Sequence, residues 1–386
     1  MPTIPPRHLE LLTTICNLPT APFCEHHVAA WLEAWADSAS LQHWRDKVGN
    51  LYVEYRRGPK SKSPLIIEAH LDHPGFLATR QSRSTLHAEF RGGVRPSHFK
   101  NAPVQFLVNS HWLPANVLSV KPRKNSRILD VTLSSKHKIP KSSLGMWNLP
   151  DTQIKNKIFS ARVCDDLASV AAITSLFEDL QHHKQNAHVI AMFDRAEEVG
   201  FAGVIAACKN GYLPPTARII GLETSKGGPH APQGAGVIIR VGDRTGIFSP
   251  GLTHFLSQAA GFISDDNPHF KSLRKLMDAG MCNSTPFTAF GFDTAALCLS
   301  LGNYHNMHIK SDLGYNDAPT AGKSKLLASE TIHLDDYESM IQLLLETIRR
   351  YPSYKPNFRE LRDRLTKMHK TDQATLLYQT AHPNHM

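Results

Sequence analysis

The sequence has no long apolar run. No segment reaches the roughly 18 consecutive apolar residues of a membrane-spanning helix, so neither a membrane span nor a membrane partner is expected. The start, MPTIPPRHLELL, has no basic stretch followed by an apolar run, so no secretory signal is expected. The 6 cysteines are scattered without a CxxC pair, which predicts reduced thiols in a cytoplasmic protein rather than a disulfide framework.

Several catalytic motifs are also missing. The chain has no GxGxxG and no GxxxxGK[ST] stretch, which disfavours an enzyme that binds nucleotides. It has neither HExxH nor GxSxG, which excludes the zincin metalloproteases and the serine hydrolases of the nucleophile-elbow type. Any hydrolytic chemistry must therefore come from another arrangement of side chains.

Positive charge is in excess, with a net charge of +9 over 386 residues. Part of this excess lies between residues 121 and 141, where Asp130 is the only acidic residue. The basic residues there are Lys121, Arg123, Lys124, Arg127, Lys136, Lys138 and Lys141. Few aromatic residues accompany them, so we expect a solvated surface and no specific nucleic-acid site. An anionic peptide or surface stays open as a partner of this stretch.

The chain alternates strand-like and helix-like segments, except in one region. The run SPLIIEAHLD contains a short, continuous apolar segment typical of a strand covered on both faces. From residue 77 to 157, short alternating runs follow one another and none has a helical period. We therefore predict a discontinuous α/β domain (1–76 and 158–352), an inserted β-domain (77–157) and a polar, helix-prone C-terminal extension (353–386).

Acidic and histidine residues recur where the apolar runs end. They are His70, Asp72, Asp165, Asp166, Glu197, Glu198, Glu223 and His305. Each pair alone is a weak signal, but strand ends of one sheet lie together at one edge, so distant positions converge. One histidine per metal, with shared and terminal carboxylates, suits two divalent ions about 3.5–4 Å apart. A carboxylate outside the coordination shell can then act as a general base.

The ordered stretches AHLDHPGF, VCDDLAS, RAEEVGFAG, GLETS, MDAGM and LGNYHN resemble the tetrahedral (TET) aminopeptidase family. This family includes the glutamyl and deblocking aminopeptidases and relatives labelled endoglucanases, and the resemblance extends to about residue 350. It implies a zinc-peptidase α/β/α domain of three layers with a mixed sheet and an inserted β-barrel or PDZ-like domain. It also implies peptide substrates and a homo-oligomer as large as a dodecamer.

The resemblance implies a role for each matching position. The metal ligands would be His70, Asp165, Glu198, Glu223 and His305. Asp165 would bridge two metals, with zinc as the expected ion and cobalt or manganese as alternatives. In the family, a hydroxide that bridges the metals attacks the N-terminal peptide bond.

Two further positions have roles by the same resemblance. Glu197 would be the general base, and Asp72 would orient the imidazole of His70 through the far ring nitrogen. Asp166 follows the bridging residue, and family members often have a cis peptide bond between the two.

The chain also departs from the family pattern. Glu223 stands where the family usually has Asp, and His73 stands where it often has Glu. Near the end of the domain both His305 and His308 are candidate ligands, and an ungapped match favours His305. Two alternative functions stay open: a deacylase of N-acyl amino acids or another small-amide hydrolase, and a catalytically inactive binding protein on a peptidase scaffold.

Overall fold

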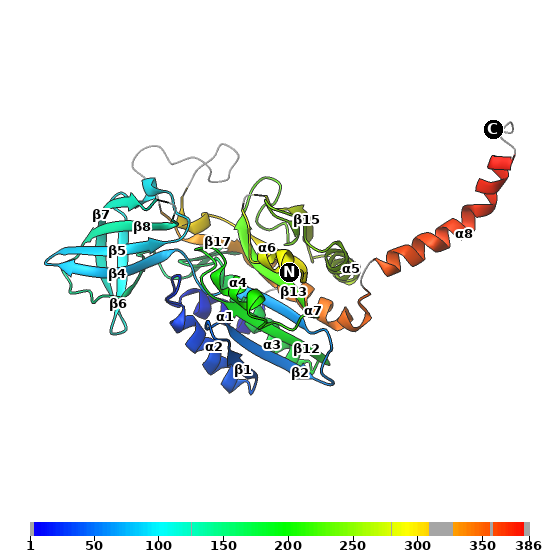
Figure 1. The fold of residues 1–386 in the computed structure, drawn as a ribbon, viewed down its shortest axis with the longest axis horizontal. Coiled ribbons are helices and arrows are strands. Elements are labelled where there is room, and N and C mark those ends of the chain that lie inside the picture. Colours follow the sequence, from blue (N-terminus) through cyan, green and yellow to red (C-terminus); the bar gives the residue numbers. More distant parts are fainter. Residues whose placement is uncertain (1–3, 125, 279, 309–326, 356–357, 382–386) are drawn as a thin grey trace.

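The computed structural model describes residues 4–124, 126–278, 280–308, 327–355 and 358–381. Its centre is an eight-stranded mixed sheet with the order β1-β2-β12-β3-β13-β16-β14-β15 (Figure 1). The strands are β1 (Gln42–Arg45), β2 (Leu51–Arg57), β12 (Ala187–Asp194), β3 (Leu65–His70), β13 (Arg218–Lys226), β16 (Asp293–Leu301), β14 (Val237–Gly242) and β15 (Ser272–Leu276). Strands β12, β3, β13 and β16 are parallel neighbours, so their carboxyl ends share one edge.

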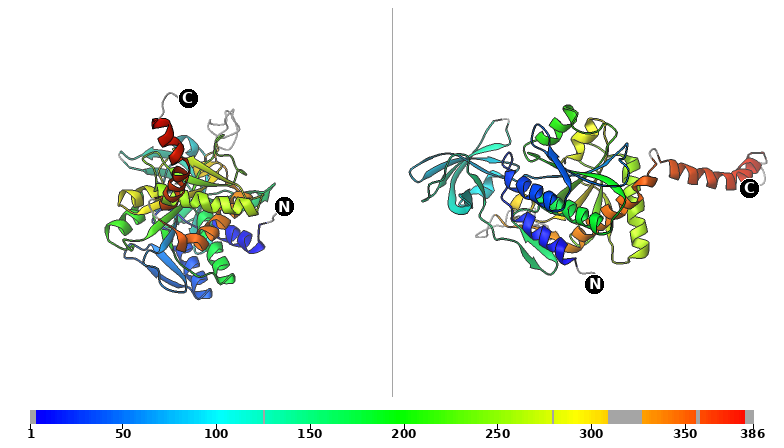
Figure 2. Two further views of the ribbon diagram at one scale, coloured as in Figure 1. Left: turned by 90° about the vertical axis from the view of Figure 1, so that its right-hand side faces the viewer. Right: turned by 90° about the horizontal axis from the view of Figure 1, so that it is seen from below.

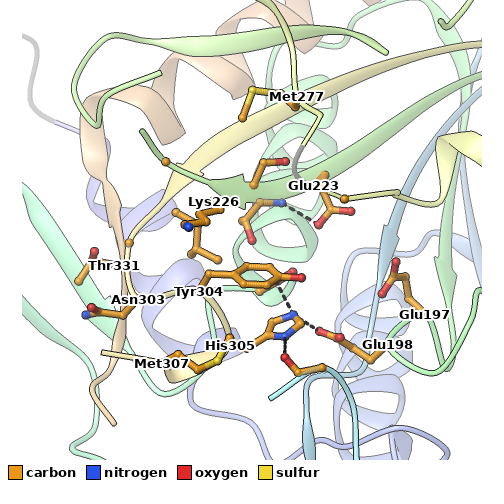
Figure 3. A pocket seen from close by; sticks show the side chains of 18 of the residues that line it. Glu197, Glu198, Glu223, Lys226, Met277, Asn303, Tyr304, His305, Met307 and Thr331 are labelled. Atoms are coloured by element: carbon orange, nitrogen blue, oxygen red, sulfur yellow. Dashed lines mark hydrogen bonds and ion pairs between the residues drawn. The ribbon is translucent and has the colours of Figure 1, made fainter. Parts of the chain in front are cut away.

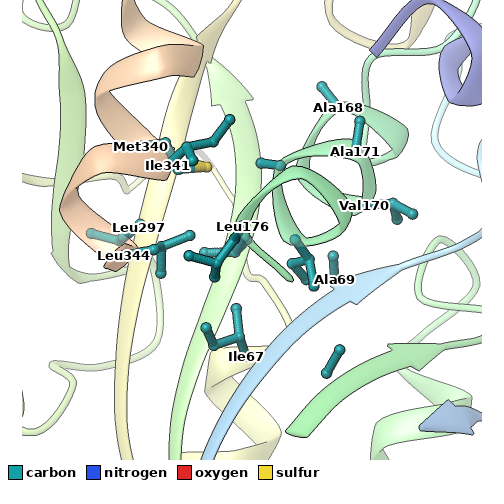
Figure 4. Close-up of a cluster of buried hydrophobic side chains, with 14 of the residues drawn as sticks. Ile67, Ala69, Ala168, Val170, Ala171, Leu176, Leu297, Met340, Ile341 and Leu344 are labelled. Carbon is teal, nitrogen blue, oxygen red and sulfur yellow. The ribbon is translucent and has the colours of Figure 1, made fainter. Parts of the chain in front are cut away.

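Helices cover both faces of this sheet. One layer contains α1 (Pro6–Cys16), α2 (His26–Ser38), α3 (Leu167–His182), α5 (Pro250–Asp266) and α7 (Leu334–Arg350). The opposite layer contains α4 (Ala202–Lys209) and α6 (Ser284–Ala289). Figure 4 shows the larger core, where Leu176 of α3 and Leu344 of α7 meet Ile67 and Leu297 of the sheet. The predicted three-layer α/β/α architecture with a mixed sheet is thereby confirmed.

The position of strand β3 in the sheet explains why apolar and polar residues do not alternate in its sequence. All six of its residues are buried. Ile67 and Ala69 pack against the layer of α3 and α7, whereas Ile66 packs with residues of α4 and α6 on the other face. A strand covered on both faces needs apolar side chains at odd and even positions, and this produces the continuous apolar run.

The inserted region contains a closed, six-stranded barrel that projects from one side of the sheet domain (Figures 1 and 2). Its strands, in the order β4-β5-β8-β7-β6-β9, are β4 (Gly75–Ser82), β5 (Thr85–Arg91), β8 (Ile128–Ser134), β7 (His111–Pro122), β6 (Pro103–Val108) and β9 (Leu144–Trp147). Aromatic rings fill its interior, with Phe76 and Trp147 edge to face at 4.8 Å between centroids. Of the two predicted insert types, the structure has the β-barrel.

The remaining elements are short or peripheral. A three-stranded sheet consists of β10 (Gln153–Lys155), β11 (Ile158–Ala161) and β17 (Glu330–His333), and the 3₁₀ turns are Pro96–Phe99, Tyr304–Asn306 and Tyr351–Ser353. Helix α8 (Arg359–Ala381) extends away from the sheet domain (Figures 1 and 2). Residues 356–357 and 382–386 of the predicted extension lie outside the described residues. Within the described ranges, every helix is too short or too polar to cross a bilayer.

A buried histidine ties three helices of the larger layer together. His8 of α1 lies with Nδ1 3.0 Å from Glu338 Oε2 of α7 and Nε2 3.3 Å from Asp179 Oδ1 of α3. Burial opposes a charge on this ring, but the two carboxylates outweigh it and raise the pKa of His8 to about 9. Because this value lies above the unfolded pKa near 6.5, protonated His8 stabilises the fold fully below about pH 6.5.

We expect the stabilisation by His8 to disappear as the pH rises through about 9. The variant His8→Gln should lose less unfolding free energy than the wild type between pH 6.5 and 9.5, because it has no proton to release there. Urea unfolding followed by circular dichroism at both pH values measures the difference. Equal losses in the two proteins would contradict a role for this ion-pair cluster.

Candidate metal centre

Five of the predicted site residues meet at the carboxyl edge of the parallel strands. His70 ends β3, Glu223 lies on β13, and His305 follows β16, while Asp165 precedes α3 and Glu198 follows β12. All five side chains are buried, although their positions span much of the chain. The sheet topology therefore brings together the residues that the strand-end pattern singles out.

These residues form two groups that share one member. His70, Asp165 and Glu223 have ligand atoms within 4.8 Å of one another, and so do Asp165, Glu198 and His305. Asp165 Oδ1 lies 3.4 Å from His70 Nε2, and Asp165 Oδ2 lies 3.5 Å from His305 Nε2. One carboxylate thus turns a different oxygen toward each imidazole, as a carboxylate that bridges two cations would.

The hydrogen bonds on the far side of each ring define which nitrogen faces the site. His70 Nδ1 lies 3.0 Å from the carbonyl oxygen of Asp72, and His305 Nδ1 lies 2.9 Å from that of Gly93. A carbonyl can only accept, so both Nδ1 atoms carry a hydrogen, and in the neutral form of each ring Nε2 presents a lone pair. Neutral rings held in this way are ready to act as metal ligands.

Both Nε2 atoms face carboxylate oxygens. His305 Nε2 lies 3.0 Å from Glu198 Oε1, and His70 Nε2 lies 3.9 Å from Glu223 Oε1. Among the described residues, Asp165 Oδ1 and Glu198 Oε1 are buried without a hydrogen-bond partner. A neutral imidazole and a carboxylate that face each other in a buried site need a proton or a metal cation between them. This donor set of imidazole nitrogen and carboxylate oxygen fits divalent zinc, cobalt or manganese.

The pKa values of these side chains also show that the site favours added positive charge. Burial opposes a charge on His70, but Asp165, Asp72 and Glu223 outweigh it and raise the pKa of His70 well above 6.5. The pKa of His305 is likewise raised, by Glu198 and Asp165, against the effect of burial. Burial raises the pKa of Glu223, which accepts a proton more readily than an exposed glutamate does. A divalent cation would satisfy the same carboxylates.

The turn that carries Glu197 and Glu198 is held through its backbone. Consecutive amides of residues 195–198 donate to Asn50 Oδ1, Glu25 Oε1, Asp72 Oδ1 and Asp72 Oδ2, at 3.2, 3.1, 2.9 and 3.1 Å respectively. Four successive amides are thus satisfied by side chains, in a segment that forms neither helix nor strand. This network sets the position of the two glutamates relative to His70.

Asp72 is positioned differently from the expectation. Its carboxylate lies 3.6 Å from His70 Nδ1, and the closer contact of that nitrogen is the backbone carbonyl of Asp72. The carboxylate oxygens are directed to the amides of Glu197 and Glu198, because those amides would otherwise be buried without acceptors. Asp72 therefore orients the imidazole through its main chain and the glutamates through its side chain.

The other candidates at this edge lie outside both groups. His308 Nδ1 lies 3.2 Å from Asn303 Oδ1, so the structure brings His305 and not His308 to the site. His73 supports Asp165, since its Nδ1 lies 2.7 Å from the carbonyl oxygen of that residue. Asp166 is fully buried beside the site, and the peptide bond between Asp165 and Asp166 is cis.

Sequence reasoning missed Glu330. Its Oε2 accepts the amides of Cys164 and Asp165 at 2.8 and 2.9 Å, and its Oε1 accepts the amide of His305 at 2.8 Å. One buried carboxylate therefore holds the backbone of two residues of the candidate centre. Burial raises the pKa of Glu330 to about 7. The only available signal was a glutamate in the short alternating segment ETIH, which is too weak to single out.

The centre opens into a cavity of about 450 Å³ (Figure 3). Glu197, Glu198, Glu223 and His305 all line it, so solvent and small molecules reach the candidate ligands. A second lobe of about 450 Å³ adjoins it and shares Glu197, Glu198 and His305. Burial, together with Glu198 and Glu223, raises the pKa of Glu197 well above 4.5, against the effect of His70. In the predicted segment MDAGM, Ala279 lies outside the described residues.

The fold is similar to that of known peptidases. The structure is similar to the Pyrococcus horikoshii TET1 peptidase, with a TM-score of 0.68, 20% identity and coverage of 88% of this chain and 99% of that one. It is also similar to aminopeptidase APDkam598 from the archaeon Desulfurococcus kamchatkensis, with a TM-score of 0.70, 17% identity and coverage of 92% and 99%. At this level of identity, the likeness establishes the fold.

The sequence comparisons identify the family. The chain is 23% identical over 108 residues to the cytosol non-specific dipeptidase of Escherichia coli (strain K12), which covers 28% of this chain. The match spans only 19% of that relative. The model of the M42 glutamyl aminopeptidases matches residues 49–313, which is more than half of the chain. The chain therefore belongs to the M42 glutamyl aminopeptidase family, a family of peptide hydrolases.

Proposed function

We propose that this protein is an aminopeptidase that removes the N-terminal residue of peptides with the help of two divalent metal ions. The observation that carries the proposal is the position of Asp165, which turns one carboxylate oxygen toward each of two imidazoles. His70 and Glu223 would complete one site, and Glu198 and His305 the other. Bound metals would supply a water of lowered pKa and a polarised carbonyl at this position.

Glu197 is the proposed general base. It lines the cavity, belongs to neither ligand group, and is held by its amide at Asp72. Its raised pKa means that it can hold a proton in this environment. In the proposed reaction, Glu197 accepts a proton from the attacking water and delivers it to the leaving amine.

One wall of the cavity supports binding of a terminal residue. Buried side chains that include Ser225, Arg240 and Leu301 line this part of the first lobe. Arg240 donates to Ser225 Oγ at 2.9 Å and to backbone carbonyls, so this wall is held in place. In the proposed binding mode, the terminal residue of the peptide lies against this wall. A substrate would therefore enter with its amino terminus first.

The variant Glu197→Gln tests the general base. We expect it to bind as much metal as the wild type and to lose at least about 10³-fold in kcat, because it cannot transfer the proton. A panel of aminoacyl anilides with added zinc, cobalt or manganese measures the activity, and Glu10→Gln on the surface of α1 is the matched control. Full activity of Glu197→Gln would exclude it as the base, and binding without turnover in the wild type would indicate an inactive scaffold.

Substitutions of the ligands test the shared carboxylate. We expect Asp165→Asn to lose both metals, whereas His70→Ala and His305→Ala should each lose one, because Asp165 alone belongs to both groups. Elemental analysis of dialysed protein gives the metal content per chain. Metals that bind only the folded state should also raise the melting temperature, so a chelator should lower it in the wild type and have little effect in Asp165→Asn. Full metal content in Asp165→Asn would contradict the bridging role.

We also propose that the chain forms a homo-oligomer. The support comes from the structural neighbours, one of which is described as a dodecamer and another as able to form a tetrahedron or an octahedral shell. The expected particle has a mass several times the 43.0 kDa of the chain, and twelve times that mass for a dodecamer. Sedimentation velocity at several concentrations measures it. A single species at the chain mass at every concentration would contradict the proposal.

A further inference from the structure

The second lobe of the cavity is lined by three arginines from separate segments. Arg95 follows β5, Arg127 lies between β7 and β8, and Arg244 follows β14. All three side chains are exposed, and in the described residues none of them forms an ion pair with a carboxylate. Among the residues that the structure describes, the carboxylates in the lining are Glu197 and Glu198, which belong to the proposed catalytic centre. The three guanidinium groups outnumber these two carboxylates, so the lining carries an excess of positive charge beside the position of the reaction.

Two of these arginines are tied to other residues of the cavity lining. Arg127 Nη1 donates to the backbone carbonyl of Glu198 at 3.4 Å, which holds the β7–β8 connection against the metal-binding turn. The amide of Arg244 donates to the carbonyl of Gly280 at 3.2 Å, which ties its loop to another residue of the lining. The floor between the arginines is apolar and buried, with Val94, Leu129 and Phe201. Among the described lining residues, an anion here would compete with the carboxylates of Glu197 and Glu198.

The two lobes differ in their lining. Buried Ser225, Arg240 and Leu301 line the first alone, and Arg127 and Arg244 line the second alone, while both share Arg95, Glu197, Glu198 and His305. If the terminal residue of a peptide fills the first lobe, its scissile bond lies at the junction. The residue after that bond then lies in the arginine-lined lobe.

We infer that the arginine-lined lobe binds a carboxylate of the residue that follows the cleaved bond, an inference that rests on the proposed aminopeptidase function. Guanidinium groups bind carboxylates through paired N–H donors, and three of them from different directions favour an anion and disfavour a cation. The carboxylate can come from two sources. It is either the side chain of Asp or Glu in a longer peptide, or the C-terminal carboxylate of a dipeptide.

Matched peptides distinguish the two sources. With X as the N-terminal residue that the anilide panel favours, the set is X-Glu-NH₂, X-Gln-NH₂, X-Lys-NH₂, X-Ala-NH₂ and X-Ala with a free carboxylate. We expect X-Glu-NH₂ to exceed X-Gln-NH₂, or X-Ala to exceed X-Ala-NH₂, by at least about tenfold in kcat/KM, mainly through KM, as a hydrogen-bonded charge would give. The first preference identifies the side chain and the second identifies the C-terminus. The preference should weaken as salt is raised.

Variants of the arginines test the assignment through the same ratios. In Arg95→Gln, Arg127→Gln and Arg244→Gln the preference for the anionic peptide should fall several-fold, and in Arg244→Glu it should shift toward X-Lys-NH₂. Arg80→Gln, an exposed arginine of β4 outside both lobes, should keep the wild-type ratio. Ratios below about twofold in the wild type, or ratios that the three variants leave unchanged, would overturn the inference.

The inference about the arginine-lined lobe and the proposed aminopeptidase function can fail separately. If the metal-loaded wild type cleaves none of the peptides, the aminopeptidase proposal fails, and calorimetric titration of the same set still tests the lobe. Tighter binding of X-Glu-NH₂ than of X-Gln-NH₂, lost in Arg244→Gln, would then support an anion-binding lobe. Equal binding of the two peptides would contradict it.

Discussion

In the candidate metal centre, the described side chains supply too little positive charge for the buried carboxylates. Parallel strands carry several buried carboxylates to one sheet edge, and the two imidazoles that meet them turn Nε2 toward the oxygens. Such a group of acceptors is costly to bury unless cations lie among them. Asp165 belongs to both groups of candidate ligands, since its two carboxylate oxygens face different imidazole rings. The proposal of two cations rests on this position of Asp165.

Carboxylates at this edge have a second task, which is to hold the main chain. Asp72, Glu25 and Glu330 accept amides from the segments that carry the candidate ligands and the proposed base. These amides lie in turns, where no neighbouring strand can accept them. Side-chain acceptors from distant segments replace the hydrogen bonds that a neighbouring strand would supply, and they make the turns rigid. The precision of the candidate centre comes from these supports as much as from the ligands themselves.

Much of this arrangement could be predicted from the sequence because a buried parallel strand appears there as a continuous apolar run. The continuous apolar run in β3, followed by His70, is visible without a structure. Helix α5, in contrast, was not predicted, and its signal was the cap Ser249 before Pro250. The closed barrel could not be told from a PDZ-like unit, because closure depends on the pairing of β4 with β9 across the whole insert. The second task of Asp72 was also hidden, since its partners lie 125 and 126 positions away.

The contact between Gly93 and His305 makes the inserted barrel part of the chemistry. Gly93 lies in the segment that leaves β5, and its carbonyl determines which nitrogen of His305 carries the hydrogen. A small rotation of the barrel away from the sheet domain would withdraw that carbonyl and free the ring to turn or to change tautomer. The affinity of His305 for a cation therefore depends on the position of the whole barrel relative to the sheet domain. Any contact that fixes or loosens the barrel from outside would therefore act on the candidate metal centre at a distance, with no change in the candidate ligands themselves.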